Sequence, residues 1–143
     1  MVSNNKKIYY VKKEVIDKAL NKEYRQYFIG ELARPQILDY LEQGDLEIGT
    51  SLYREPKADT PHMHSKTSEI LYILKGIYKI LDIDKNEEYI LNEGDFFVLP
   101  PKTPYASKAT TNTQVLFIKT GGNDKIPIEI SDRVQTWISD LNE

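Results

Sequence analysis

The sequence contains no cysteine and only two histidines among its 143 residues. Without cysteine the chain can form neither a disulfide nor a thiolate zinc site, and it has no cysteine nucleophile. Any metal site built on His62 and His64 therefore holds at most two imidazoles, and no further imidazole or thiolate can complete its coordination sphere.

Long apolar runs and clusters of positive charge are also missing. The apolar runs are a few residues long, far short of the roughly 20 needed for a membrane-spanning helix. The N-terminus has no apolar signal core, so we expect a cytoplasmic protein without a membrane partner. The 19 Lys and Arg are scattered among 22 Asp and Glu, which gives no basic stripe for nucleic acid.

What is present is typical of a folded globular chain, with 40% hydrophobic and 29% charged residues. A chain of this length is expected to form one domain whose core needs neither disulfides nor structural metals. Its ten tyrosines favour strands and pocket walls.

The first 45 residues predict an N-terminal extension, 1–45, that covers or pairs with the edge of the main domain. Their patterns predict four short elements: an edge strand at Ile8–Val11, a helix at Lys13–Lys22, a strand within Tyr24–Leu32, and a helix between Pro35 and Gly44.

From residue 46 to 120 the sequence changes to short β-prone runs separated by Pro, Gly, Asn and Asp. Such runs at regular spacing indicate an all-β sandwich or barrel, and the lack of helical periodicity argues against a doubly wound α/β fold. The predicted strands are Leu46–Tyr53, His62–His64, Glu69–Leu74, Ile77–Ile83, Glu88–Leu91, Phe96–Leu99 and Gln114–Lys119.

The last part, 121–143, predicts a loop followed by a helix. Ser131 can cap the helix, and Val134, Trp137, Ile138 and Leu141 fall at the i, i+3, i+4 and i+7 positions of one apolar stripe. A helix this short needs packing partners, and we expect its own barrel rather than a partner subunit to supply them.

The pair His62 and His64 is the strongest chemical signal. In a strand, residues i and i+2 point to the same face, so both imidazoles would face one space with Glu69 close behind. Two imidazoles and one carboxylate suit a divalent transition metal such as Fe, Mn, Ni, Co or Zn. A surface pair, or a pair bonded within the core, is the structural alternative.

The segment from His62 to Gly76 resembles the first motif of the cupin family. That motif reads His-x-His, three or four residues, Glu, six residues and Gly, and the chain matches every element and spacing with His62, His64, Glu69 and Gly76. The resemblance implies an all-β, cupin-type jelly-roll barrel with a short N-terminal embellishment and a C-terminal helix. It also implies a homodimer with a small-molecule substrate or ligand.

The second cupin motif is matched more weakly, by Gly94 and Pro100. A histidine normally follows a few residues later, and Tyr105 stands in that place. The usual three-histidine set of the family is therefore ruled out. Tyr105 could be a metal ligand, a proton donor to substrate, or a filler of the barrel; we favour a place in the pocket wall without ligation.

These residues lead to three functional hypotheses. The first is a metal-dependent enzyme of oxygenase or isomerase type, with the ion on His62, His64 and Glu69 and with Tyr105 catalytic. The second is a metal-free isomerase or epimerase of a nucleotide-linked sugar, with one histidine as base and Tyr105 as acid. The third is a small-ligand-binding cupin without enzymatic activity.

Other side chains are candidates for the pocket wall or for structure. They are the apolar Leu71 and Ile73, the possible lining residues Tyr53, Tyr78, Phe97 and Gln114, and the anion-binding candidates Arg25 and Arg54. The run Gly121-Gly122-Asn123-Asp124-Lys125 is interpreted as a turn, because it lacks a full phosphate-loop pattern.

Overall fold

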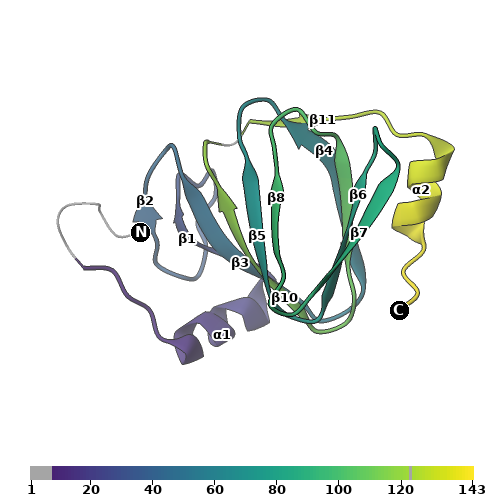
Figure 1. Ribbon diagram of the computed structural model, residues 1–143. Helices are drawn as coiled ribbons and strands as arrows, with labels where there is room; N and C mark the ends of the chain where they lie inside the picture. The colour runs from purple at the N-terminus through teal and green to yellow at the C-terminus, as the bar shows by residue number, and fades with distance from the viewer. Residues whose placement is uncertain (1–7, 123) are drawn as a thin grey trace.

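The computed structural model describes residues 8–122 and 124–143, which form a mostly β structure (Figure 1). In this part of the chain the elements are α1 (Lys13–Lys22), β1 (Arg25–Gly30), β2 (Leu41–Glu42), β3 (Glu47–Tyr53), β4 (Lys57–His64), β5 (Glu69–Lys75), β6 (Ile77–Asp82), β7 (Glu87–Asn92), β8 (Phe96–Leu99), β9 (Tyr105–Ala109), β10 (Thr113–Lys119), β11 (Lys125–Pro127) and α2 (Asp132–Ser139).

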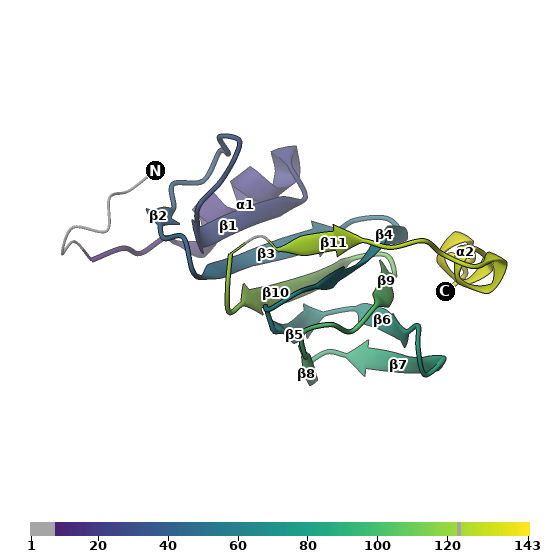
Figure 2. The same cartoon turned by 90° about the horizontal axis from the view of Figure 1, so that it is seen from above.

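The strands form two sheets of a jelly-roll arrangement. One sheet has the order β2-β1-β3-β10-β5-β8, and the other has the order β11-β4-β9-β6-β7. Neighbouring strands are antiparallel except β1 and β2, which pair in parallel. Figure 2 shows the two sheets from above, with α1 and α2 at opposite ends of the molecule. The predicted all-β jelly-roll fold with a C-terminal helix is confirmed.

The core lies between the two sheets, and strand periodicity builds it. Buried and partly buried residues alternate along β10, so that Val115 and Phe117 point inward. They meet Leu71 and Ile73 from β5, which are 3% and 0% exposed.

The N-terminal part is tied into the first sheet. Strand β1 pairs with β3, and α1 buries Ala19 and Leu20. The predicted helix between Pro35 and Gly44 is wrong, because the Gln36 side chain bonds the backbone N–H and C=O of Tyr27 at 2.8 and 2.7 Å and holds this segment beside β1. The predicted strand at Ile8–Val11 is also absent from the described residues: this segment has no strand partner there.

The C-terminal helix packs on the outer face of the second sheet. Ser131 caps α2 by accepting a hydrogen bond from the N–H of Val134, as the sequence predicts. Val134 is fully buried against Leu81 and Ala106, and Trp137 packs beside it. The helix stripe therefore packs on its own barrel.

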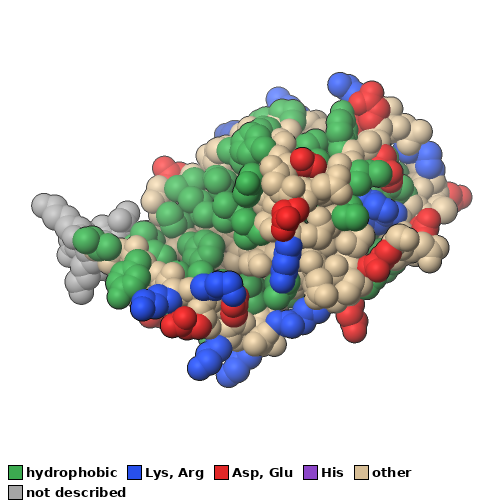
Figure 3. Space-filling model, turned by 60° about the horizontal axis from the view of Figure 1, so that its bottom comes forward, with side chains coloured by type: hydrophobic (Ala, Val, Ile, Leu, Met, Phe, Trp, Pro, Cys, Tyr) green, Lys and Arg blue, Asp and Glu red, His purple; other side chains and the backbone are tan. Residues whose placement is uncertain are grey.

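Apolar side chains gather on the face drawn in Figure 3, on the side that carries the first described residues. Ile8, Tyr10 and Val15 are among the exposed large apolar side chains of the described residues. No histidine is visible on the face drawn in Figure 3. None of the helices in the described ranges is long and apolar enough to cross a membrane.

Candidate metal centre

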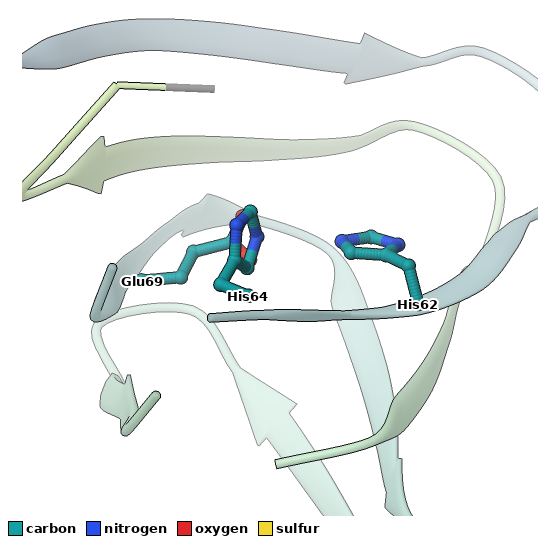
Figure 4. A group of neighbouring side chains, drawn as sticks. All are labelled: His62, His64 and Glu69. Atoms are coloured by element: carbon teal, nitrogen blue, oxygen red, sulfur yellow. The ribbon is translucent and has the colours of Figure 1, made fainter. Parts of the chain in front are cut away.

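Strand β4 presents both histidines to the interior. His62 and His64 lie two residues apart on the same side of the strand, 7% and 4% exposed (Figure 4). Glu69, at the first position of β5, is 8% exposed and joins them. One potential ligand atom from each of the three residues lies within 4.8 Å of the others. The pattern of residues i and i+2 in a strand explains the placement.

Asp124 holds the loop between β4 and β5 that brings Glu69 to the histidines. Its Oδ2 accepts the backbone N–H groups of Lys66 and Thr67 at 2.6 and 2.9 Å, and its Oδ1 accepts Nδ1–H of His64 at 2.8 Å. Burial acts to raise the pKa of Asp124, but these hydrogen bonds outweigh it and hold the pKa well below its usual value. Asp124 is thus a fixed anionic partner of His64.

The hydrogen bonds at Nδ1 also determine the tautomers of the two rings. The carbonyl oxygen of Thr60 can only accept, so Nδ1 of His62, 2.8 Å away, must carry the proton. The carboxylate of Asp124 also can only accept, so Nδ1 of His64 carries a proton as well. In each neutral ring Nε2 is therefore unprotonated and offers a lone pair, as a metal ligand requires.

Tyr105 completes the cluster through the register of two strands. Residue 105 on β9 pairs with His62 on β4, which places the phenol oxygen 2.9 Å from Nε2 of His62. The same hydroxyl donates a hydrogen bond to Oε2 of Glu69. A phenol has one proton, so it cannot donate fully to both acceptors.

His64 contributes a further unsatisfied atom. Its Nε2 is buried and has no hydrogen-bond partner, one of two such side-chain atoms among the described residues, and it lies 3.7 Å from Oε2 of Glu69. Three acceptor atoms, from His62, His64 and Glu69, therefore converge, and the one proton of Tyr105 can serve only those of His62 and Glu69. Such an arrangement is costly unless a cation or a proton joins it.

The pKa values follow from burial and these contacts. Burial lowers the pKa of His62 to about 4, against the opposing effect of the Thr60 carbonyl. Burial also acts to lower the pKa of His64, but Glu69 and Asp124 outweigh it and raise that pKa. The pKa of Glu69 falls to about 2 because His64 and Lys119 outweigh the burial that acts to raise it. The pKa of Tyr105 is raised by burial and by Glu69, so the phenol is neutral.

A cavity of about 170 Å³ lies between the sheets and reaches this cluster. His62, Glu69 and Tyr105 form part of its wall, whereas His64 lies outside the wall. The remaining lining residues come from both sheets and from the segments that flank them: Tyr24, Arg25, Ser51, Tyr53, Asp59, Thr60, Leu71, Tyr78, Ser107, Val115, Phe117, Lys119 and Lys125.

Several pocket residues expected from the sequence lie in this wall and others do not. Tyr53, Tyr78, Leu71 and Arg25 line the cavity; Ile73, Phe97, Gln114 and Arg54 do not. Arg54 is exposed and bonds Asn21.

A second polar group in the wall centres on Asp59. Its Oδ2 accepts the hydroxyls of Tyr53 and Tyr78 at 2.8 and 3.0 Å, and Arg25 lies 3.7 Å from its Oδ1. Sequence reasoning missed Asp59 and Asp124, because neither belongs to the His-x-His motif and both act through partners distant in the chain.

Comparison with known proteins gives one consistent relationship. The family model described as "Cupin domain" matches residues 53–120. A 3-hydroxyanthranilate 3,4-dioxygenase of Candida albicans is 28% identical over 104 residues, which are 68% of this chain and 60% of that protein. The chain therefore spans about 60% of the length of this relative.

Two solved structures show the same fold. The DMSP lyase DddQ of Ruegeria pomeroyi matches with a TM-score of 0.55 and 20% identity, covering 73% of this chain and 49% of that one. An RmlC-like cupin of Shewanella frigidimarina matches with a TM-score of 0.51 and 18% identity, covering 62% and 76%.

Proposed function

Because this chain is a small protein of the cupin family, we propose that it is a metal-dependent enzyme acting on a small polar metabolite. His62, His64 and Glu69 are the proposed ligands of a divalent transition metal: Fe, Mn, Ni, Co or Zn. The small metabolite would bind in the cavity beside them.

The observation that carries this proposal is the buried, unpartnered Nε2 of His64, which converges with Nε2 of His62 and the Glu69 carboxylate. Two nitrogen donors and one carboxylate oxygen suit these metals. A hydrogen bond to the outer nitrogen of each ring is the usual arrangement around metal-bound histidines, and both bonds are present, to Thr60 and Asp124.

A metal bound here would act as a Lewis acid toward a substrate oxygen, or as a site for dioxygen. The chain's own residues have separate tasks. Asp124 orients His64, and the cavity wall holds the substrate next to the ligands. Tyr105 is the proposed catalytic residue, since its hydroxyl lies at the cavity wall and can exchange a proton with Glu69 or with a bound substrate.

The similarity to 3-hydroxyanthranilate 3,4-dioxygenase supports the oxygenase branch of this proposal. At 28% identity over 60% of that protein's length it leaves the substrate of this chain open.

Metal analysis tests the proposal. Purified protein, stripped and reconstituted separately with each of the five metals, should bind one equivalent of at least one of them. His64→Ala and Glu69→Ala should each abolish binding, while Glu87→Ala, an exposed carboxylate at the start of β7, should not. A protein that takes up no metal from any of the five contradicts the proposal.

A second candidate function is favoured by the contact between Tyr105 and His62. A phenol 2.9 Å from an unprotonated imidazole nitrogen is a ready acid–base pair for a metal-free isomerase or epimerase of nucleotide-linked sugars. Glu69 has no task on this account. Turnover of nucleotide-linked deoxysugars by metal-free protein would favour it over the first candidate.

We further propose that the protein forms a homodimer. Strand β8 is an edge strand of the first sheet, and its Phe96 and Val98 are 64% and 46% exposed. They pair with Tyr72 and Ile70 on β5, so that one sheet face carries exposed apolar side chains. Sedimentation of the purified protein as a monomer at micromolar concentration would contradict this.

A further inference from the structure

Three cations surround the cavity, and two of them come from outside the matched cupin domain. Arg25 belongs to β1, Lys119 ends β10, and Lys125 begins β11. Residues 25 and 125 both lie beyond the range 53–120 that the family model covers. The cationic wall is therefore largely a property of the segments that flank the domain in this chain.

The partners of these cations differ. Arg25 is held by Ser51, Tyr53 and Asp59, with its Nε 2.8 Å from the serine oxygen. Lys119 lies 3.5 Å from Glu47.

Lys125 is different, because within the described ranges no carboxylate oxygen lies within 4.0 Å of its amine and no hydrogen bond engages it. The residue is exposed yet lines the cavity, which places it at the mouth. Burial of the amine in the cavity mouth lowers the pKa of Lys125, and the positive charges of Lys119 and Arg25 lower it further, against the opposing effect of Glu69 and Asp59. The three cations thus repel one another across one space, and an anion bound among them would relieve that repulsion.

The balance of charge in the wall favours an anion. Among the described residues, the wall contains three cations and two carboxylates, Asp59 and Glu69. Asp59 is already occupied by two tyrosine hydroxyls, and Glu69 by Tyr105. A divalent metal on the proposed ligands would add further positive charge to the same cavity.

The volume of the cavity limits what can enter. At about 170 Å³ it is close to the roughly 150 Å³ engineered cavity that accommodates benzene, and well below the range typical of drug-sized ligands. The hydroxyls of Tyr53, Tyr78 and Ser107 also lie in the wall, where they are hydrogen-bonded in one cluster around Asp59.

We propose that the cavity binds a small monocarboxylate, no larger than one six-membered ring with its carboxylate, and that Lys125 at the mouth is the group that binds the carboxylate. This inference deepens the proposed function, since it names the substrate class of the same site and rests on that site being catalytic. Lys125 is a specificity-determining residue on this account.

Calorimetric titration of the full chain tests it with two pairs of probes, benzoate against benzamide and lactate against lactamide. Each pair differs in charge at nearly constant shape. The titrations are run on metal-free and on metal-reconstituted protein, and on Lys125→Met. Lys75→Met is the matched control, because Lys75 is exposed at the end of β5 and lines no cavity wall.

At least one carboxylate should bind more tightly than its amide in both forms of the protein. Lys125→Met should weaken the binding of that carboxylate by about tenfold, as expected for one charge pair at a partly exposed site. The affinity for the amide should not change. Lys75→Met should behave as the wild-type protein. Equal binding of acid and amide, no binding of either carboxylate, or equal effects of the two lysine variants would overturn the inference.

Failure of the inference is distinguishable from failure of the proposed function. If the protein selects carboxylates but takes up no metal, the carboxylate site stands and the proposed metal-dependent enzyme is contradicted. If the protein takes up one equivalent of metal but does not select carboxylates, the proposed metal site stands and the carboxylate site is contradicted.

Discussion

Oδ1 of Asp124 accepts a hydrogen bond from Nδ1 of His64 at 2.8 Å, across 60 positions of sequence. The bond fixes the tautomer of the ring, so that its unprotonated Nε2 lies on the side of Glu69. The other oxygen of Asp124 holds the backbone of the loop that carries the chain to Glu69. One carboxylate thereby sets the positions of two proposed ligands.

Asp124→Asn should weaken metal binding by about 10–100-fold, the range found for partners of metal-bound histidines. An asparagine has a single carbonyl oxygen, so it cannot serve both His64 and the loop as the carboxylate does. A metal-competition assay with a chelator checks this. Asp95→Asn is the matched control, because Asp95 accepts the backbone N–H of Asn92 in a turn that lies outside the cavity wall. Equal affinities in the two variants would contradict the role given to Asp124.

Tyr105→Phe should leave the metal stoichiometry unchanged, because the phenol is expected to line the pocket rather than bind the ion. Turnover should fall, and the metal-free protein should lose about 1–3 kcal/mol of stability, because buried acceptors on Glu69 and His62 lose their donor. Metal analysis and denaturant unfolding measure the two effects. Tyr89→Phe, whose hydroxyl bonds Glu87 at the surface, provides the control. Loss of the ion from Tyr105→Phe would show that the phenol is a ligand.

In the metal-free protein, the pKa values of the two histidines should be shifted in opposite directions from the ordinary value of 6.5. His62 should have a pKa of about 4 because of burial, and His64 a pKa above 6.5 because of Glu69 and Asp124. Two-dimensional NMR resolves the rings, since the chain has only these two. Coincident titrations near 6.5 would contradict the buried geometry.

The same shifts predict how histidine ionisation changes the stability of metal-free protein. Because the folded pKa of His62 is lowered, the unfolded state binds more protons between about pH 4 and 6.5, and stability falls as the pH drops through this range. For His64 the effect has the opposite sign, because its folded pKa is raised. Its contribution to the stability is fully present below about pH 6.5 and is lost as the pH rises through the raised pKa. Denaturation of His62→Gln and the wild-type protein from pH 4 to 8 should show that the variant loses less stability on acidification.

Gly76→Ala should destabilise the protein more than Gly94→Ala. Both glycines have a positive φ, +80° and +86°, which costs another residue about 1–2 kcal/mol. A Cβ at Gly76 would in addition lie 2.6 Å from Cα of Thr113, whereas one at Gly94 would meet nothing within 4 Å. Thermal unfolding of the two variants measures the difference, and equal losses would show that the close approach to Thr113 is relaxed at little cost.

The placement of both histidines on one strand face could be predicted from the sequence, because strand periodicity depends on local spacing alone. His62 and His64 lie on one face of β4, and the strand at Phe96–Leu99 has the bounds that its pattern predicts. The register that places Tyr105 opposite His62 joins residues 43 positions apart, and no local pattern encodes such a pairing.

Side-chain contacts between separate segments also explain what could not be predicted from the sequence. Asp124 stands in a run interpreted as a turn, of which Asn123 lies outside the described residues, and the role of Asp124 depends on the pairing of β11 with β4. The expected helix before Gly44 failed because the side chain of Gln36 replaces a strand partner of Tyr27. In both places a side chain bonds the backbone of another segment, 9 positions away for Gln36 and 57 or 58 positions away for Asp124.

Anomalous X-ray scattering from crystals of the metal-reconstituted protein, collected at the absorption edge of the bound metal, tests the central claim most directly. We predict one peak about 2.0–2.2 Å from Nε2 of His62, Nε2 of His64 and a carboxylate oxygen of Glu69. A fully occupied peak elsewhere, or no peak among these three residues in protein soaked with each of the five metals, would contradict the account.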